Sequence, residues 1–158
     1  MDLNKAICKV AEAMLGHGED GRNNHGFWIR IWRAGQKVYG SGAWCATSAC
    51  WIVEQACYGA GMDKPLPVRR FGGGRSARKF AKRCEKFGRV VKQPMPGDVE
   101  LRDRPGVGMH IEIVATVHPG GNRTNYAGNV GKPPAKYKLV QQPPWKFDKE
   151  HVKFIRLG

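Results

Sequence analysis

The sequence predicts an α+β fold in which N-terminal helices pack on a C-terminal antiparallel sheet. Before Gly88, apolar residues recur at the spacing of amphipathic helices, whereas after it short apolar runs are separated by turns rich in Gly and Pro. Helices followed by strands are typical of this class. With 158 residues, 41% of them hydrophobic, the chain is long enough to form a core. We therefore expect a single domain over residues 1–158.

We expect four helices before Gly88: residues 2–15, "FWIRIWRA" at 27–34, residues 45–58 and a segment after "GGGRS". The second of these is short, aromatic and ambiguous, but a helix of about two turns would suit it. Asp2 can cap the first helix and Gly16 ends it, and its apolar stripe consists of Leu3, Ile7, Val10, Ala11 and Met14. The third begins at Cys45, and its inward face contains Cys45, Ala49, Ile52, Val53 and Ala56. The fourth, with Ser76 as its cap, should bury Phe80, Ala81, Cys84 and Phe87 and expose Arg78, Lys79, Lys82, Arg83 and Lys86.

After Gly88 we expect short strands at "RVVKQ", "DVELR", "HIEIVATV", "NRTNYAG", "KYKLV" and "HVKFIRL". In "HIEIVATV", alternation places Ile111, Ile113, Ala115 and Val117 on one face and His110, Glu112, Val114 and Thr116 on the other. The Pro pairs at 133–134 and 143–144 mark loops and edges of this sheet.

The chain is strongly basic, with 27 Lys and Arg residues against 13 acidic ones and a net charge of +14. Ten of the basic residues lie between Arg69 and Lys92, where Glu85 is the only acid. Such a charge favours an anionic partner: nucleic acid, a membrane surface or a bacterial envelope. We find neither a secretory signal nor a run of apolar residues that could span a membrane, so we expect synthesis in the cytoplasm.

Five cysteines, an odd number, do not predict a disulfide framework, but Cys45 has the position of a nucleophile. A helix N-terminus stabilises a thiolate through its free N–H groups and the helix dipole, and the same groups can bind an oxyanion. The other four cysteines lie inside predicted helices. The alternative is that Cys45 is a small apolar core residue.

A nucleophilic cysteine needs a base, and His110 is the best candidate among the five histidines. It opens the most apolar predicted strand, whereas the others lie in a loop or at strand margins. A third polar group would fix its tautomer. The alternative is a histidine that is simply hydrogen-bonded within the fold.

The motifs "AWCA", "PMPGDVELR", "HIEIVATV" and "NYAGN", in this order, resemble the CHAP domains of the NlpC/P60 cysteine peptidase superfamily. The loop "GEDGRNNHG" also resembles the stretch before the cysteine in many phage members, and the resemblance runs from about residue 6 to 130. These domains have a papain-like fold and occur in phage endolysins and bacterial cell-wall hydrolases. The resemblance therefore implies a papain-like arrangement of the predicted helices and sheet.

Matched to this family, Cys45 is the nucleophile, His110 the base and Asn129 the polar residue that ends the next strand. Two positions depart from the family pattern. Many relatives have Glu where this chain has Ala127, and Gly or Ala where it has Glu112. Glu112 shares the predicted face of His110, and we expect its carboxylate to touch substrate or to raise the pKa of His110 rather than to orient the ring tightly.

The resemblance implies a monomeric peptidoglycan hydrolase that cleaves an amide bond of the wall peptide, as an amidase or an endopeptidase, in the manner of a phage lysin. Trp44 would either line its cleft or pack in the core. We expect no cofactor and no metal, since no Cys/His set has zinc spacing and "HGEDGRNN" lacks a Ca²⁺-loop pattern. The basic surface would bind anionic polymers of the envelope once the enzyme reaches the wall.

The alternative function is a basic nucleic-acid-binding protein without catalytic activity. It would use "RRFGGGRSARKFAKRCEKFGR" to contact phosphates. This hypothesis predicts salt-sensitive binding that survives the loss of Cys45, but it leaves the order of the cysteine and histidine motifs unexplained.

Overall fold

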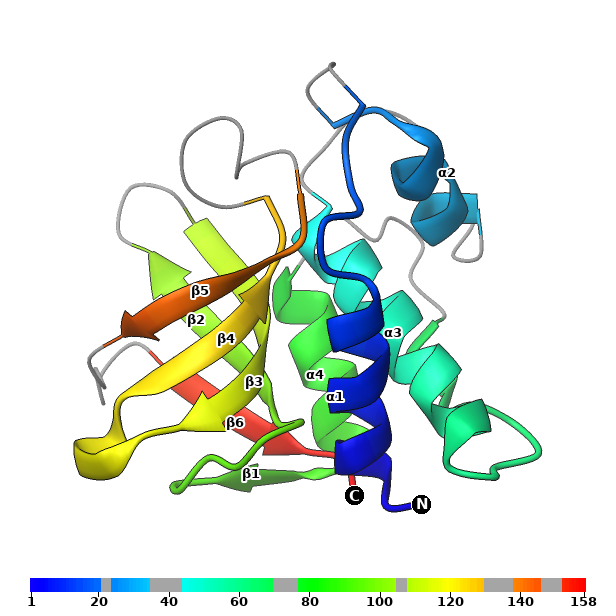
Figure 1. Cartoon of the computed structure of the whole chain (residues 1–158). Helices are drawn as coiled ribbons and strands as arrows, with labels where there is room; N and C mark the ends of the chain where they lie inside the picture. The colour runs from blue at the N-terminus through cyan, green and yellow to red at the C-terminus, as the bar shows by residue number, and fades with distance from the viewer. Residues whose placement is uncertain (21–23, 35–43, 70–76, 105–107, 130–137, 146–151) are drawn as a thin grey trace.

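The computed structural model describes residues 1–20, 24–34, 44–69, 77–104, 108–129, 138–145 and 152–158. Helices pack on one side of a strongly twisted antiparallel sheet (Figure 1), so the predicted α+β class is confirmed. The α-helices are α1 (Leu3–Ala13), α2 (Phe27–Ala34), α3 (Cys45–Gly59) and α4 (Ala77–Phe87). The strands are β1 (Arg89–Val91), β2 (Val99–Arg104), β3 (Gly108–Val117), β4 (Arg123–Ala127), β5 (Val140–Trp145) and β6 (Val152–Arg156).

The helices form where the apolar spacing predicts them. Asp2 caps α1, since its Oδ1 accepts a hydrogen bond from the backbone N–H of Asn4 at 2.8 Å. The central helix α3 is buried on nearly every side, because it packs against α1, α2, α4 and strand β3. In α4, Phe80, Ala81 and Cys84 are buried as expected. Phe87 is not: it is 40% exposed, because α4 ends there and the chain turns into the edge strand β1.

The six strands that the structure describes are ordered β1-β6-β2-β3-β4-β5. The last of these differs from the predicted "KYKLV" segment: β5 starts at Val140 and includes Pro143 and Pro144. Since β5 pairs only with β4, these prolines lie on a sheet edge, as their missing N–H groups require. Ser76, Pro133, Pro134 and His151 lie outside the described residues.

Both faces of the central strands are buried, which simple alternation does not predict. Ile111 pairs with Leu101 and Ile113 with Val99, and these four side chains join the core beneath the helices. On the opposite face, Glu100 and Glu112 are also buried. That face is covered because the sheet curls over it.

A contact between β4 and β6 reveals this curl. The guanidinium carbon of Arg123 lies 4.9 Å from the ring centroid of Phe154. In a flat sheet these two strands would be three strand spacings apart, roughly 14 Å. The side chains therefore meet across a concave face that points away from the helices.

The carboxylate of Glu100 lies on this concave face and joins its own strand, β2, to β4. Both of its oxygens accept hydrogen bonds from Arg123, and it also accepts one from Arg102 at 2.6 Å and one from Asn125 at 2.7 Å. Burial by itself would raise the pKa of Glu100. The hydrogen bonds and positive charges of Arg123 and Arg102 outweigh that effect and hold the pKa below its usual range.

Within the described ranges, every helix is too short or too polar to cross a lipid bilayer.

We expect Glu100→Gln to lower the free energy of unfolding by about 3–5 kcal/mol at pH 7, because it leaves the buried charge of Arg123 without its partner. Glu85→Gln is the matched control: its carboxylate forms an exposed pair with Lys153, and we expect a loss below about 1 kcal/mol. Urea unfolding of each variant measures both values.

The advantage of the wild type over Glu100→Gln should also depend on pH. Because the folded pKa of Glu100 is depressed, its contribution is complete above the ordinary value of about 4.3 and is lost as pH falls through the lower folded value. A pH-independent difference, or equal losses for Glu100→Gln and Glu85→Gln, would contradict this description of the network.

Candidate active site

Cys45 is the first residue of α3, as the sequence predicts, and its side chain is 7% exposed. The preceding residue, Trp44, is the N-cap and makes no side-chain hydrogen bond to the helix. The hydroxyls of Thr47 and Ser48 donate to the carbonyl oxygen of Trp44 instead. The N-cap side chain therefore does not occupy the N–H groups of the first turn, and these groups are the ones that can stabilise a thiolate or an oxyanion.

Trp44 packs in the core and does not line a cleft. It is 0% exposed, its ring centroid lies 5.1 Å from that of Trp32, and its Nε1 donates to Glu19 Oε1 at 2.7 Å. The other oxygen of this buried carboxylate, Oε2, has no hydrogen-bond partner among the described residues. Glu19 thus fixes the residue next to Cys45 through one strong contact.

The ring of Trp44 also contacts the backbone just after β4. A Cβ atom at Gly128 would lie 2.2 Å from the ring, so only glycine fits there. Gly128 directly precedes Asn129, and Trp44 directly precedes Cys45. The contact therefore brings the start of α3 beside the segment that carries Asn129.

His110 lies near the start of β3, opposite Arg102 of β2, and is 6% exposed. The ladder between β3 and β4 ends at the Ile113–Tyr126 pair, three residues after His110 on β3 and three residues before Asn129, which follows the end of β4. Asn129 has a φ of 60°, a left-handed conformation that Asn tolerates better than most residues. The two polar candidates thus belong to one end of the same pair of strands.

Glu112 lies beside His110, as their place on one face of β3 predicts. It is 1% exposed, and its Oε1 lies 3.4 Å from His110 Nε2. Its Oε2 accepts a hydrogen bond from Asn125 at 2.6 Å and lies 3.4 Å from Arg102 Nη2. Since Asn125 and Arg102 also bind Glu100, the side chain of Glu112 is fixed by the network in the concave face.

The orientation of His110 defines where it can act. Its neighbour Ile111 points to the helices, so His110 points to the concave side of the sheet. The helix that starts at Cys45 packs on the other side, against β3. A reaction that uses both residues must therefore occur at the rim of the sheet, where β3 begins and the segment after β4 meets the start of α3.

The remaining cysteines are poor candidates for a nucleophile. None of the five cysteines forms a disulfide. Burial, with the nearby charges of Glu12, Asp98 and Asp2, raises the pKa of Cys8 to about 11. Burial also raises the pKa of Cys57 and, more strongly, that of Cys84. Cys50 is fully buried, with its sulfur 3.7 Å from the carbonyl oxygen of Val68.

The sequence pattern does not predict that Glu19, Glu100 and Asn125 hold the candidate site. The signal for Glu100 was present, since Glu100 and Arg102 alternate with Val99 and Leu101, but that pattern normally indicates a solvated face. Only the curl of the sheet buries it. The contact of Glu19 with Trp44 spans 25 residues and leaves no local pattern.

In the part of the chain that the structure describes, no three His, Cys, Asp or Glu side chains come together as metal ligands would. Comparison of the chain with known protein families, characterised proteins and solved structures finds no match.

We expect iodoacetamide at pH 7 to alkylate Cys45 before any other cysteine, because only its sulfur lies at the N-terminus of a helix. Cys8 should react only as the pH approaches 11, while Cys57 and Cys84 should resist until the protein unfolds. Peptide mass spectrometry after timed labelling measures each site. Labelling of Cys8 ahead of Cys45 at neutral pH would contradict the assignment.

Proposed function

We propose that the protein is a peptidoglycan hydrolase that cleaves an amide bond of the wall peptide with Cys45 as its nucleophile. The observation that carries the proposal is the position of Cys45 at the start of α3, on a turn whose N-cap residue offers no side-chain acceptor. The ordered motifs that resemble CHAP domains support the same chemistry. Both amidase and endopeptidase activity fit this site.

In the proposed mechanism, His110 accepts the thiol proton and the Cys45 thiolate attacks the carbonyl carbon of the amide. N–H groups of the first turn of α3 stabilise the negative charge on the tetrahedral intermediate. His110 returns the proton to the leaving amine, and the acyl group remains on the sulfur. Water, deprotonated by His110, then releases the acid and restores the thiol.

Glu112 and Asn129 would have different tasks in this mechanism. The Glu112 carboxylate, 3.4 Å from His110 Nε2, favours a proton on that nitrogen and leaves Nδ1 to exchange a proton with the thiol. Asn129, which follows the end of β4 at the same end of the sheet as the start of β3, would contribute an amide at the rim. Glu112 thereby supplies a carboxylate in a chain that has Ala127 where many relatives have Glu.

The basic surface supports the proposed anionic environment but fits a second function as well. Arg78, Lys79, Lys82 and Lys86 lie exposed along α4. In the proposed hydrolase they would attract anionic polymers of the envelope, and in a nucleic-acid-binding protein they would contact phosphates. Binding to nucleic acid that is salt-sensitive and unaffected by Cys45→Ala, without any wall hydrolysis, would favour the second function.

We expect Cys45→Ala to lower the rate of wall hydrolysis by about a thousandfold or more, because the acyl-enzyme cannot form. Cys8→Ala, which removes a partly buried thiol from α1, should retain the wild-type rate within about twofold. The measurement is the loss of turbidity of purified walls, with thermal melting to verify that both variants fold. Wild-type hydrolysis by folded Cys45→Ala would exclude the mechanism.

Asn129 and Glu112 can be separated by pH profiles of kcat. Glu112→Gln removes a negative charge beside His110 and should move the acid limb to lower pH, since the protonated form of the Cys45–His110 pair is then less stable. Asn129→Gly removes the side-chain amide, while glycine adopts the left-handed φ of this position without strain. We therefore expect kcat to fall about a hundredfold, with the acid limb of its pH profile at the same pH as in the wild type.

Asn24→Gly is the control for Asn129→Gly, because Asn24 also has a left-handed φ, of 58°. If the acid limb of the kcat profile of Glu112→Gln lies at the wild-type pH, the carboxylate of Glu112 does not influence the protonation of His110. An unchanged kcat in Asn129→Gly would remove Asn129 from the mechanism.

A further inference from the structure

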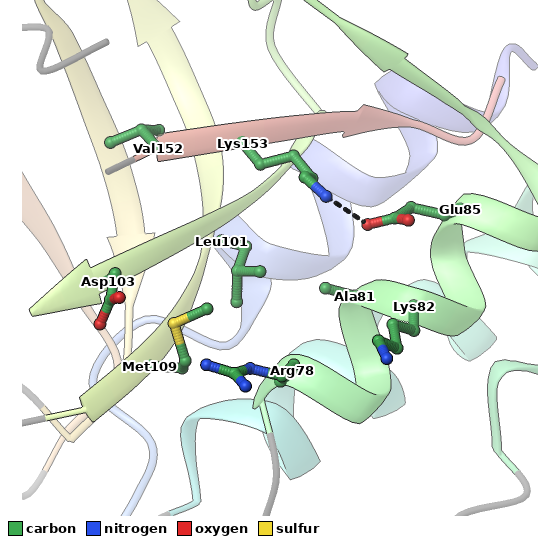
Figure 2. Close-up of a pocket in the computed structure, with 9 residues that line it drawn as sticks. All are labelled: Arg78, Ala81, Lys82, Glu85, Leu101, Asp103, Met109, Val152 and Lys153. Carbon is green, nitrogen blue, oxygen red and sulfur yellow. Dashed lines mark hydrogen bonds and ion pairs between the residues drawn. The ribbon is translucent and has the colours of Figure 1, made fainter. Parts of the chain in front are cut away.

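A pocket of about 370 Å³ opens between α4 and strands β2, β3 and β6, and its lining includes none of Cys45, His110 and Asn129. Figure 2 shows its apolar floor, with Leu101 and Met109 between Asp103 on one side and the charged side chains of α4 on the other. Its volume lies within the range of small-ligand sites. It is therefore large enough for one or two residues of a peptide.

One wall of this pocket carries two cations. Arg78 and Lys82 lie one turn apart on α4, and both are exposed. Neither forms an ion pair with another described residue, and Figure 2 shows the Arg78 guanidinium directed toward Met109. By contrast, Lys153 and Glu85, which also line the pocket, are 3.0 Å apart and neutralise each other.

The opposite wall carries Asp103, which is exposed and pairs with Met109 in the β2–β3 ladder. Figure 2 places Asp103 across the apolar floor from Arg78 and Lys82. A nucleic acid or a phosphate polymer has no cationic group to pair with this carboxylate. A ligand matches both walls when it has an anionic group at one end of a short apolar stretch and a cationic group at the other end.

We propose that this pocket is a binding subsite for a zwitterionic part of a peptide, with a carboxylate on Arg78 and Lys82, an ammonium group on Asp103, and aliphatic carbons on Leu101 and Met109. The inference rests on the proposed function, because the diamino acid of a wall peptide has this chemistry. Met109 directly precedes His110 along β3. The subsite therefore begins one residue from the proposed base, on the other face of the strand.

The test measures binding of the tripeptide L-Ala–D-Glu–diaminopimelate to the Cys45→Ala variant by calorimetry, so that no cleavage interferes. Two further ligands carry one change each: an acetylated side-chain amine, or amidated diaminopimelate carboxylates. Two variants are made in the Cys45→Ala background. A double variant, Arg78→Gln with Lys82→Gln, removes both cations of the α4 wall, and Asp103→Asn removes the carboxylate opposite them. The control is Lys86→Gln, which removes an exposed cation of α4 outside the pocket.

We expect the double variant to bind the parent tripeptide about tenfold more weakly and to bind the amidated ligand unchanged. Asp103→Asn should bind the parent about three- to fivefold more weakly and the acetylated ligand unchanged, and Lys86→Gln should behave as the background protein. The proposed subsite would be wrong if a variant lost the same affinity for all three ligands, or if Lys86→Gln weakened binding as much as the pocket variants do. If this charge-matched binding appears but the wild type hydrolyses no wall, the subsite stands and the proposed function fails.

Discussion

The buried carboxylate of Glu100 is the constraint on which the sheet and the candidate site depend. It joins Arg102 of its own strand to Arg123 and Asn125 of β4, and Arg123 in turn packs on Phe154 of β6. A carboxylate is stable in such a buried place only when its hydrogen bonds and opposite charges compensate for the lost water. The sheet must therefore curl enough to bring these strands together, and the curl creates the concave face at whose rim His110 lies.

The same network reaches the proposed chemistry through Glu112. Asn125 and Arg102 each contact both Glu100 and Glu112, so the carboxylate beside His110 is held by groups that also stabilise the fold. On the other side of the sheet, Glu19 and Gly128 fix Trp44, and thereby the start of α3. Both proposed reacting groups thus belong to rigid elements, which is what a preorganised site needs.

Periodicity could predict α1, α3 and α4, the beginning of α3 at Cys45, and most of the strands, because these depend on local spacing. It could not predict which sheet faces are covered. Glu112 has the pattern of an accessible residue and is buried by a curl that depends on contacts between distant strands. The burial of Trp44 and the exposure of Phe87 could not be predicted from local spacing either, because both depend on contacts with distant parts of the chain.

Mass spectrometry of wall fragments decides whether Cys45 catalyses cleavage of an amide bond in peptidoglycan, as we propose. Walls from several bacterial species would be digested with wild-type protein and with Cys45→Ala, and the new chain ends identified. Catalysis by Cys45 predicts a free amine and a free carboxyl group at one type of bond, formed only by the wild type. New reducing sugar ends, or identical fragments from both proteins, would contradict it.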